Sequence, residues 1–408
     1  MLHIAKPLFR RPLTPALVVL QVALACAIGC NLLFLLRQRL APLLASDGIG
    51  DPAHVVLLYD ITPRGVPWNA AELRGLEDHL RMIDGVSSVS YAASLPLLES
   101  MQVTADVYGN DPRVTASTTI YIGDHLSDTL GLKRVAGRNF TATEQATTLG
   151  MDMGFAVPGP VIVTRSLAKR LFPGGQALGR MIHYVGAPGG RIVVGIVNHL
   201  VRNVAENDYG SIGYAMLFPG VPERWPSPLF VAHLDTLETG RVCRALVDAV
   251  KADIGPDLLA QDTPQCMTYT RLHDAAMAEP RAAVTLFSGV ALIVLVVALS
   301  GIVGMTSNWV RQRRRWIGVK RSLGARRADI VRELLSENLI VIGSGTLLGA
   351  VGACVLNFWL MRAYEFSRLP LAYLPAGVAL LLVLGQLAAL VPALRASRIP
   401  PVAAIRGA

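Results

Sequence analysis

Four long apolar stretches divide the chain. The first runs for 21 residues without a formal charge, and three more follow in the last third of the sequence. A helix of about 20 apolar residues crosses the roughly 30 Å hydrocarbon core of a bilayer. We therefore predict four transmembrane helices, the last of them short enough to borrow residues 371–376 at its outer end. The predicted spans are residues 16–36, 282–310, 334–360 and 377–394.

A cleaved signal peptide is the competing interpretation of the first apolar stretch. Its apolar core would be shorter, about 7–15 residues, and a cleavage site with small residues would follow at once. Here Arg37 and Arg39 follow instead. The sequence therefore favours a transmembrane helix that continues outward as a stalk.

The segment between the first two spans, residues 37–281, is polar and rich in turns. Asn69 offers an N-cap to a helix that ends near Ile83, between two strands, and a second strand and helix occur near its end. These patterns predict an α+β domain with small split β-α-β units and a core of its own. The predicted strands are 54–61, 86–92, 102–108, 161–164, 180–185, 191–197 and 229–234, and the second helix is 240–254.

Composition supports a membrane protein, since 52% of the residues are hydrophobic and only 16% are charged, against about 25% in soluble domains. The net charge of +9 comes from basic residues beside the apolar stretches, where the positive-inside rule places them in the cytoplasm. Residues 1–15, 311–333 and 395–408 are therefore predicted to be cytoplasmic, with residues 37–281 and the short loop 361–376 outside. Nucleic-acid binding is not expected, because recognition-helix and zinc-finger patterns are missing.

The external segment shows little catalytic chemistry. The eight histidines form no HExxH pair, no GxSxG elbow occurs, and the absence of a Gly-Lys dipeptide excludes a Walker A loop. His79 is expected to be a solvated surface histidine. We therefore predict no catalytic, cofactor-binding or metal-binding residues in this chain.

Two cysteines of the external segment, Cys243 and Cys266, leave two interpretations open. They could form a disulfide if that side of the membrane is oxidising. They could equally be two separate thiols, because the sequence does not show the distance between them.

Small residues recur four positions apart in two of the spans. Gly345 and Gly349 lie on the third span, and Ser300 and Gly304 on the second. Such steps let helices approach closely. We favour packing within one bundle over a seam between two subunits.

Three groups of residues resemble one family. Ile317-Gly318-Val319-Lys320-Arg321-Ser322-Leu323-Gly324-Ala325 resembles the cytoplasmic loop of the MacB/FtsX-like (type VII) ABC transporter permeases. The tail, with Pro392-Ala393-Leu394-Arg395-Ala396 and Pro401 to Arg406, resembles the C-terminal signature of that family. External pieces around Gly137-Arg138-Asn139-Phe140 and Leu178-Gly179-Arg180 resemble its periplasmic core domain. The order of one span, a large outer domain and three further spans is also similar.

The resemblance implies a machine with several subunits in the bacterial inner membrane. A cytoplasmic ATPase dimer would bind ATP and Mg²⁺, and a second permease, identical or different, would complete the membrane part. A periplasmic adaptor or membrane-fusion protein is a further possible partner. The basic loop would form a coupling helix that docks on the ATPase, and Asp in place of Ile317 or Leu323 would uncouple it. The expected docking residues are Arg315, Trp316, Ile317, Gly318, Val319, Lys320, Arg321, Leu323, Gly324 and Ala325.

Two departures from the family pattern, and one alternative function, qualify this expectation. Trp316 stands where the family usually has a glutamate, and Ala403 stands where it often has an acidic residue. Either change could alter which ATPase is recognised, or indicate a heterodimer. The alternative function is an FtsX-like scaffold whose external domain regulates a cell-wall hydrolase. An external enzyme has no motif in its support.

Overall fold

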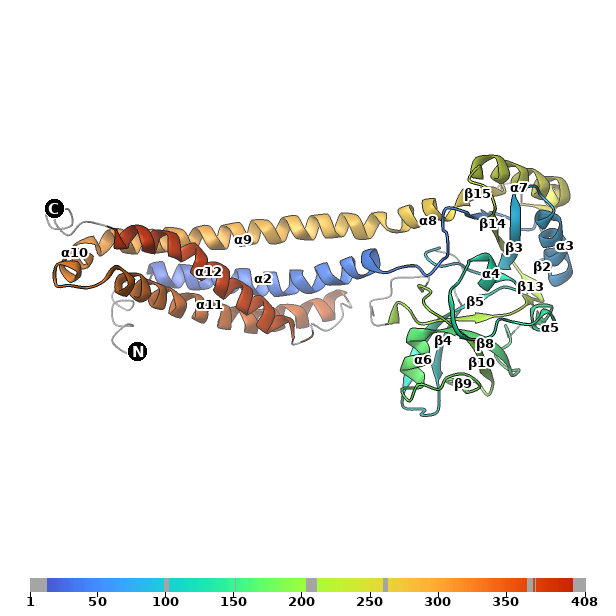
Figure 1. Ribbon diagram of the computed structural model, residues 1–408, viewed down its shortest axis with the longest axis horizontal. Coiled ribbons are helices and arrows are strands. Elements are labelled where there is room, and N and C mark those ends of the chain that lie inside the picture. Colours follow the sequence, from blue (N-terminus) through green and yellow to red (C-terminus); the bar gives the residue numbers. More distant parts are fainter. Residues whose placement is uncertain are drawn as a thin grey trace. The chain divides into compact units, whose positions relative to one another are not determined.

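The computed structural model describes residues 13–98, 103–150, 152–202, 211–259, 263–364, 370 and 372–398. The chain forms two compact units (Figure 1). Residues 1–40 with 281–408 form one, called here the membrane unit, and residues 41–280 form the other, called the inserted domain. Among the predicted segments, residues 1–12, Gln102 and the tail from residue 399, with Pro401 to Arg406, lie outside the described residues.

The membrane unit is helical. Four of its helices are long and apolar enough to cross a membrane, so the chain has the predicted number of spans. The break between α8 and α9 falls at Met277, and Pro280 lies in the first turn of α9, where its missing N–H is not needed. The helices are α2 (Leu13–Leu44), α9 (Ala278–Gln312), α10 (Arg314–Ser322), α11 (Arg327–Tyr364) and α12 (Tyr373–Ser397).

Glycines bring α11 against α2. A Cβ atom placed on Gly345 would lie 2.9 Å from Val22 Cβ, and one on Gly349 would collide with Cys26 and the backbone of Ala23. The two glycines therefore pack within one bundle, as predicted. Gly304, by contrast, has open space beside it. A cluster with members from all four long helices, including Val22, Ile302, Ile342 and Ala389, fills the centre of the bundle.

The inserted domain begins and ends in a four-stranded sheet of order β15-β1-β14-β3. Each neighbouring pair is antiparallel, so β1 and β3 run parallel with β14 between them, and β14 and β15 run parallel with β1 between them. The two predicted split β-α-β units therefore interleave in a ferredoxin-like arrangement. The elements are β1 (Val55–Tyr59), α3 (Ala70–Arg81), β3 (Val86–Ala92), β14 (Leu229–Leu234), α7 (Thr239–Ile254) and β15 (Gln265–Thr268).

A larger sheet is inserted between β3 and β14. Its order is β6-β10-β8-β11-β5-β4-β9, and β9 also pairs with β10, so the six strands from β10 to β9 close into a barrel with β6 beside it. Closure leaves few exposed strand edges. The strands are β4 (Val103–Tyr108), β5 (Thr115–Ile122), β6 (Arg134–Gly137), β8 (Gly159–Thr164), β9 (Met181–Tyr184), β10 (Gly190–Val197) and β11 (Ala215–Phe218).

Short elements complete the domain. Two-residue strands pair as β2 with β13 and as β7 with β12. The Pro173–Gly175 turn follows a helix, α6. The bounds are β2 (Trp68–Asn69), α4 (Leu126–Thr129), α5 (Ala142–Gln145), β7 (Thr148–Leu149), α6 (Arg165–Leu171), β12 (Val221–Pro222), β13 (Arg224–Trp225), η3 (Gly255–Asp257) and α8 (Tyr269–Ala276).

One continuous apolar core joins the two sheets of the inserted domain. Its members include Val56, Tyr91 and Phe230 of the small sheet, and Ile120 and Val163 of the barrel. All five side chains are fully buried. The domain therefore has the core of an independently folding unit, which the sequence predicted.

The ends of α3 agree with the predicted boundary. The side chain of Asn69 accepts hydrogen bonds from the backbone N–H groups of Ala71 and Glu72. The Glu72 carboxylate in turn accepts a hydrogen bond from the backbone N–H of Asn69. This capping box fixes the start of the helix. His79, expected to be a solvated surface residue, is partly exposed and forms an ion pair with Asp253 of α7.

Candidate functional site

Helix α10 is a short separate helix between α9 and α11. It ends in a Schellman motif, in which the N–H of Ala325 bonds to the carbonyl of Lys320 and the N–H of Gly324 bonds to that of Arg321. Gly324 has a φ of +97°, a backbone conformation that favours glycine. Gly324 therefore serves to end α10, so that the chain can turn into α11.

One face of α10 is buried in the membrane unit. Ile317 is only 1% exposed and belongs to a cluster with Ile330 and Leu334 of α11 and Ala393 and Ala396 of α12. Gly318 is buried as well. The prediction that Ile317 and Gly318 lie at a docking surface is therefore wrong. Ile317 holds α10 against the bundle.

Polar contacts also fasten α10 to the rest of the membrane unit. Lys320 Nζ lies 2.9 Å from a carboxylate oxygen of Glu333, and Arg321 donates a hydrogen bond of 3.0 Å to the carbonyl of Ser397. Just before α10, Arg313 binds both carboxylate oxygens of the buried Glu337, at 2.7 and 2.8 Å. Lys320 and Arg321, expected to meet a partner, thus contact α11 and α12 instead.

The opposite face of α10 is apolar and exposed. Trp316 is 43% exposed, Val319 44% and Leu323 82%. Their spacing of three and four residues places them on one side of a helix. The ring of Trp316 also carries Lys320 Nζ at 3.9 Å from its centre. We call Trp316, Val319 and Leu323 the apolar stripe. Arg314 and Arg315, which are also exposed, directly precede Trp316 in the chain.

The expected docking residues therefore divide into two groups. The apolar stripe and Arg315 are open to a partner, whereas the remaining residues act within the chain. That second group is Ile317, Gly318, Lys320, Arg321, Gly324 and the partly buried Ala325. A rigid, anchored helix with one free apolar side is suited to helix-in-groove recognition by another protein.

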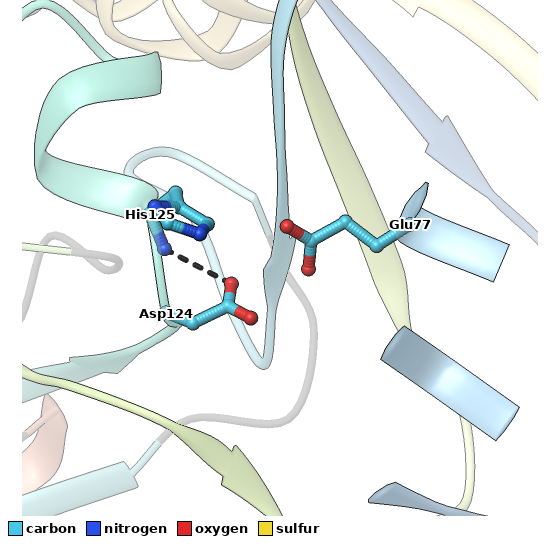
Figure 2. A group of neighbouring side chains, drawn as sticks. All are labelled: Glu77, Asp124 and His125. Carbon is cyan, nitrogen blue, oxygen red and sulfur yellow. Dashed lines mark hydrogen bonds between the residues drawn. The ribbon is translucent and has the colours of Figure 1, made fainter. Parts of the chain in front are cut away.

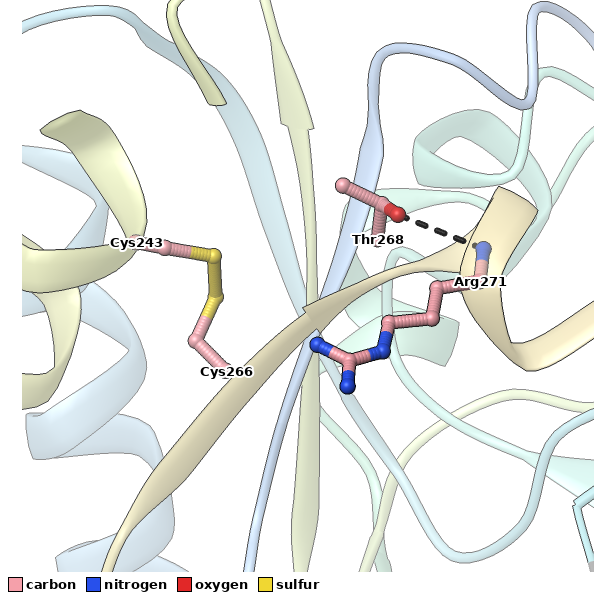
Figure 3. The surroundings of a disulfide bond; sticks show 4 residues. All are labelled: Cys243, Cys266, Thr268 and Arg271. Atoms are coloured by element: carbon pink, nitrogen blue, oxygen red, sulfur yellow. Dashed lines mark hydrogen bonds between the residues drawn. A yellow bond between two sulfur atoms is a disulfide. The ribbon is translucent and has the colours of Figure 1, made fainter. Parts of the chain in front are cut away.

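In the inserted domain, Cys243 and Cys266 form a disulfide with a Cα–Cα distance of 5.5 Å. Figure 3 shows that it joins α7 to β15. Two residues further on, the hydroxyl of Thr268 accepts a hydrogen bond from the N–H of Arg271 and caps α8. The disulfide thus fixes the strand that leads into α8.

Asp47 joins the two ends of the inserted domain. The hydroxyl of Tyr269 donates a hydrogen bond of 3.2 Å to its carboxylate, and His273 Nε2 lies 3.6 Å from the same oxygen. Burial raises the pKa of Asp47, while His273 opposes the rise. Asp47 follows α2 and Tyr269 begins α8, so this contact spans 222 residues of sequence. Sequence reasoning missed it, and no local pattern indicates it.

Glu77, Asp124 and His125 place three possible metal ligands within 4.8 Å of one another (Figure 2). Both Glu77 oxygens already have partners, because Arg81 binds one at 2.5 Å and the backbone N–H of Tyr91 donates to the other at 3.2 Å. Tyr91 lies in β3, the last strand of the small sheet. We therefore interpret Glu77 as the group that satisfies the free edge of this strand. A cation here would also lie beside the Arg81 guanidinium.

The chain matches a known family over its last three spans. Residues 288–401, which include α10 and the apolar stripe, match the family described as FtsX-like permease C-terminal. The uncharacterized ABC transporter permease YvrN of Bacillus subtilis (strain 168) is 23% identical over 354 residues, which cover 79% of this chain and 82% of YvrN.

Fused ATP-binding/permease proteins also match. The macrolide export ATP-binding/permease protein MacB of Azoarcus sp. (strain BH72) is 24% identical over 392 residues, which cover 90% of this chain and 55% of MacB. The chain thus spans about half the length of that relative. Among solved structures, the periplasmic region of MacB from Actinobacillus actinomycetemcomitans is similar, with a TM-score of 0.37 and 14% identity over 57% of this chain and 95% of that one.

The segment that carries the family match contains three of the four spans, and the sequence similarity to YvrN and MacB extends over most of the chain. The inserted α+β domain is then the extracytoplasmic domain between the first and second spans. The C-terminal part of the chain matches the FtsX-like permease family, and the chain is a homologue of the MacB- and YvrN-type ABC transporter permeases.

Proposed function

We propose that this permease transmits the movement of a separate ATPase to its extracytoplasmic domain, and that α10 is the element on which the ATPase docks. The observation that carries the proposal is the apolar stripe, which is exposed on a helix whose other face is fixed to α11 and α12. An exposed apolar side flanked by arginines is typical of a protein interaction site.

In the proposed arrangement, α10 and both termini lie in the cytoplasm of a bacterial cell, and the inserted domain lies in the periplasm. The basic residues near α10 support this orientation, and the Cys243–Cys266 disulfide supports an oxidising surrounding for the domain. ATP and Mg²⁺ would bind to the ATPase dimer. A second permease and a periplasmic adaptor would complete the machine.

Substitution within α10 tests the docking proposal. Leu323→Asp should weaken capture of the purified ATPase at least about 10-fold, because it places a charge in the apolar stripe. Leu237→Asp is the matched control, since Leu237 is 71% exposed in the inserted domain. It should capture the ATPase normally.

Ile317→Asp should behave differently from Leu323→Asp. A carboxylate at this buried position lacks a partner, which typically costs more than about 3 kcal/mol. The expected result is a lower thermal midpoint of the detergent-solubilised permease, whereas Leu323→Asp leaves the midpoint unchanged. Normal ATPase capture and normal ATP-dependent activity by Leu323→Asp would contradict the assignment.

A further inference from the structure

A second surface of the membrane unit lies next to α10, between the start of α11 and the end of α12. It is a groove of about 540 Å³. Its floor is apolar and consists of Ala328, Val331, Leu335 and Leu394. Its rim carries three guanidinium groups, from Arg327, Arg332 and Arg398.

Basic side chains line this groove, and acidic side chains do not. The nearby carboxylates all have partners outside the groove lining: Asp329 accepts from the backbone N–H of Arg326 just before α11, Glu333 pairs with Lys320, and Glu337 pairs with Arg313. The groove itself has no acidic residue in its lining.

The three rim arginines are free to bind an anion. Among the residues that the structure describes, no acceptor lies within hydrogen-bonding or ion-pairing distance of the Arg327, Arg332 or Arg398 side chains. Three unpaired guanidinium groups around one groove attract an anion strongly, and guanidinium binds phosphate in a bidentate manner.

We propose that this groove binds the headgroup of an anionic phospholipid. Leu335 and Leu394 belong to helices that cross the membrane, so the apolar floor continues toward the hydrocarbon core, while the arginines lie at the helix ends, where phosphates lie. Basic pockets between transmembrane helices on the cytoplasmic side are suited to such headgroups. A soluble anion would use the arginines but would leave the apolar floor bare.

The assignment to the inner leaflet rests on the orientation proposed above. The binding itself does not depend on ATPase docking, so the two proposals can fail separately. The bound lipid would lie against the first turn of α11, which follows α10 directly. Lipid composition would then influence how firmly α10 is held.

Lipid titration of the purified full-length permease, followed by native mass spectrometry without the ATPase, tests the inference. Phosphatidylglycerol should bind about 10-fold more tightly than phosphatidylcholine with the same acyl chains. The variant Arg327→Gln/Arg332→Gln/Arg398→Gln should lose this preference. The control Arg311→Gln/Arg326→Gln/Arg395→Gln removes the same charge from residues that do not line the groove, and it should keep the preference.

A second variant keeps every charge. Ala328→Trp fills the groove with an indole ring, and Ala328 is exposed, so the fold should tolerate it. This variant should lose the preference for phosphatidylglycerol as the triple variant does.

Four results would overturn the inference. Equal loss of preference in the two triple variants would show a general effect of charge, and retention in Ala328→Trp would show that the groove is not used. Displacement of the lipid by millimolar inorganic phosphate would identify a soluble-anion site. Lipid binding that appears only when the chain ends at Arg398 would identify residues 399–408 as the occupant.

Discussion

The carboxylate of Glu77 closes the free edge of β3, and its surroundings make it sensitive to pH. Burial, and then the neighbouring Asp124, raise the pKa of Glu77 to about 9. A pKa above the unfolded value of about 4.5 means that the folded domain holds this proton more tightly. The stability that it contributes is complete below about pH 4.5 and is lost as the pH rises through about 9.

Glu77→Gln should remove this pH dependence. From pH 6 to pH 9, the free energy of unfolding of the isolated domain 41–280 should fall by at least about 1 kcal/mol, and that fall should vanish in Glu77→Gln. Urea denaturation at several pH values measures it. Asp78→Asn is the control, since Asp78 is largely exposed on the same helix. A pH dependence that survives Glu77→Gln would assign it to another group.

Gly324 gives a prediction about how α10 is held. Gly324→Ala places a side chain at a φ of +97°, which costs about 1 kcal/mol. We expect a looser end of α10 and a several-fold weaker capture of the ATPase. Gly75→Ala, in the middle of α3 with open space around it, should instead stabilise the inserted domain by up to about 1 kcal/mol. Unchanged capture by Gly324→Ala would show that the Schellman motif is dispensable.

At single residues, the sequence predicts hydrogen bonds within one helical turn better than it predicts which side of a helix is buried. The N-cap at Asn69 follows from neighbouring residue types, because the bond closes within one turn. Ile317 was misplaced because α10 has apolar residues on two sides, and the pattern does not show which side meets α11 and α12. The contacts of Asp47 and Glu77 could not be predicted from the sequence, because their partners are distant in sequence or are backbone groups.

Among the elements, β15 has little support from neighbouring strands. It is an edge strand of four residues that pairs with β1 alone in its sheet, and the Cys243–Cys266 disulfide fixes it to α7. Crosslinks of this kind contribute about 2–4 kcal/mol. Cys243→Ala/Cys266→Ala should lower the stability of the domain by this amount and speed hydrogen exchange in residues 265–268.

The control for the disulfide is a free cysteine of the membrane unit. Cys354→Ala, at an exposed position on α11, should leave exchange in the domain unchanged. A reducing agent should reproduce the double variant. If exchange in β15 stays slow after reduction, the pairing with β1 holds the strand by itself.

The sequence predicted three strands of the small sheet, β1, β3 and β14, and four strands of the barrel, β4, β8, β9 and β10. It missed β15 and β6. β3 and β14 have the predicted bounds, because each is a compact apolar run between turns. β5 and β11 were missed. β5 contains three threonines, and β11 has only four residues. They pair with each other across nearly a hundred residues. The pattern of apolar and polar residues within each strand does not indicate such a distant partner.

For the whole molecule, the order of the spans and the inserted domain followed from hydropathy alone. The reason is that an apolar helix needs about 20 residues to cross a bilayer, and stretches of this length are recognisable in a sequence. How the proposed movement would pass into the domain depends on contacts that hydropathy does not show. The chain enters the inserted domain after α2 and leaves it through α8. Asp47, Tyr269 and His273 link these two connections within the domain.

Asp47→Ala should therefore disturb transmission without affecting ATPase capture. In the permease with its ATPase, hydrogen exchange measured with and without ATP should change together in residues 46–54 and 269–276, because the Asp47 contacts join them. In Asp47→Ala the two segments should respond independently. Asp51→Asn, an exposed position on the same connection, should keep the joint response.

The titration of Asp47 adds a second readout. Because burial raises its pKa, the protonated form is favoured in the folded domain, and its contribution to stability is lost as the pH rises through the folded value. Burial opposes ionisation of the Asp47 carboxyl, whereas the attraction between its negative charge and His273 favours it. Asp47→Asn keeps an acceptor for the Tyr269 hydroxyl but removes the charge. In Asp47→Asn, the two segments should still respond together at low pH. This joint response should no longer depend on pH. A joint response that persists in Asp47→Ala would show that the apolar contacts of Tyr269 and Leu272 carry the movement alone.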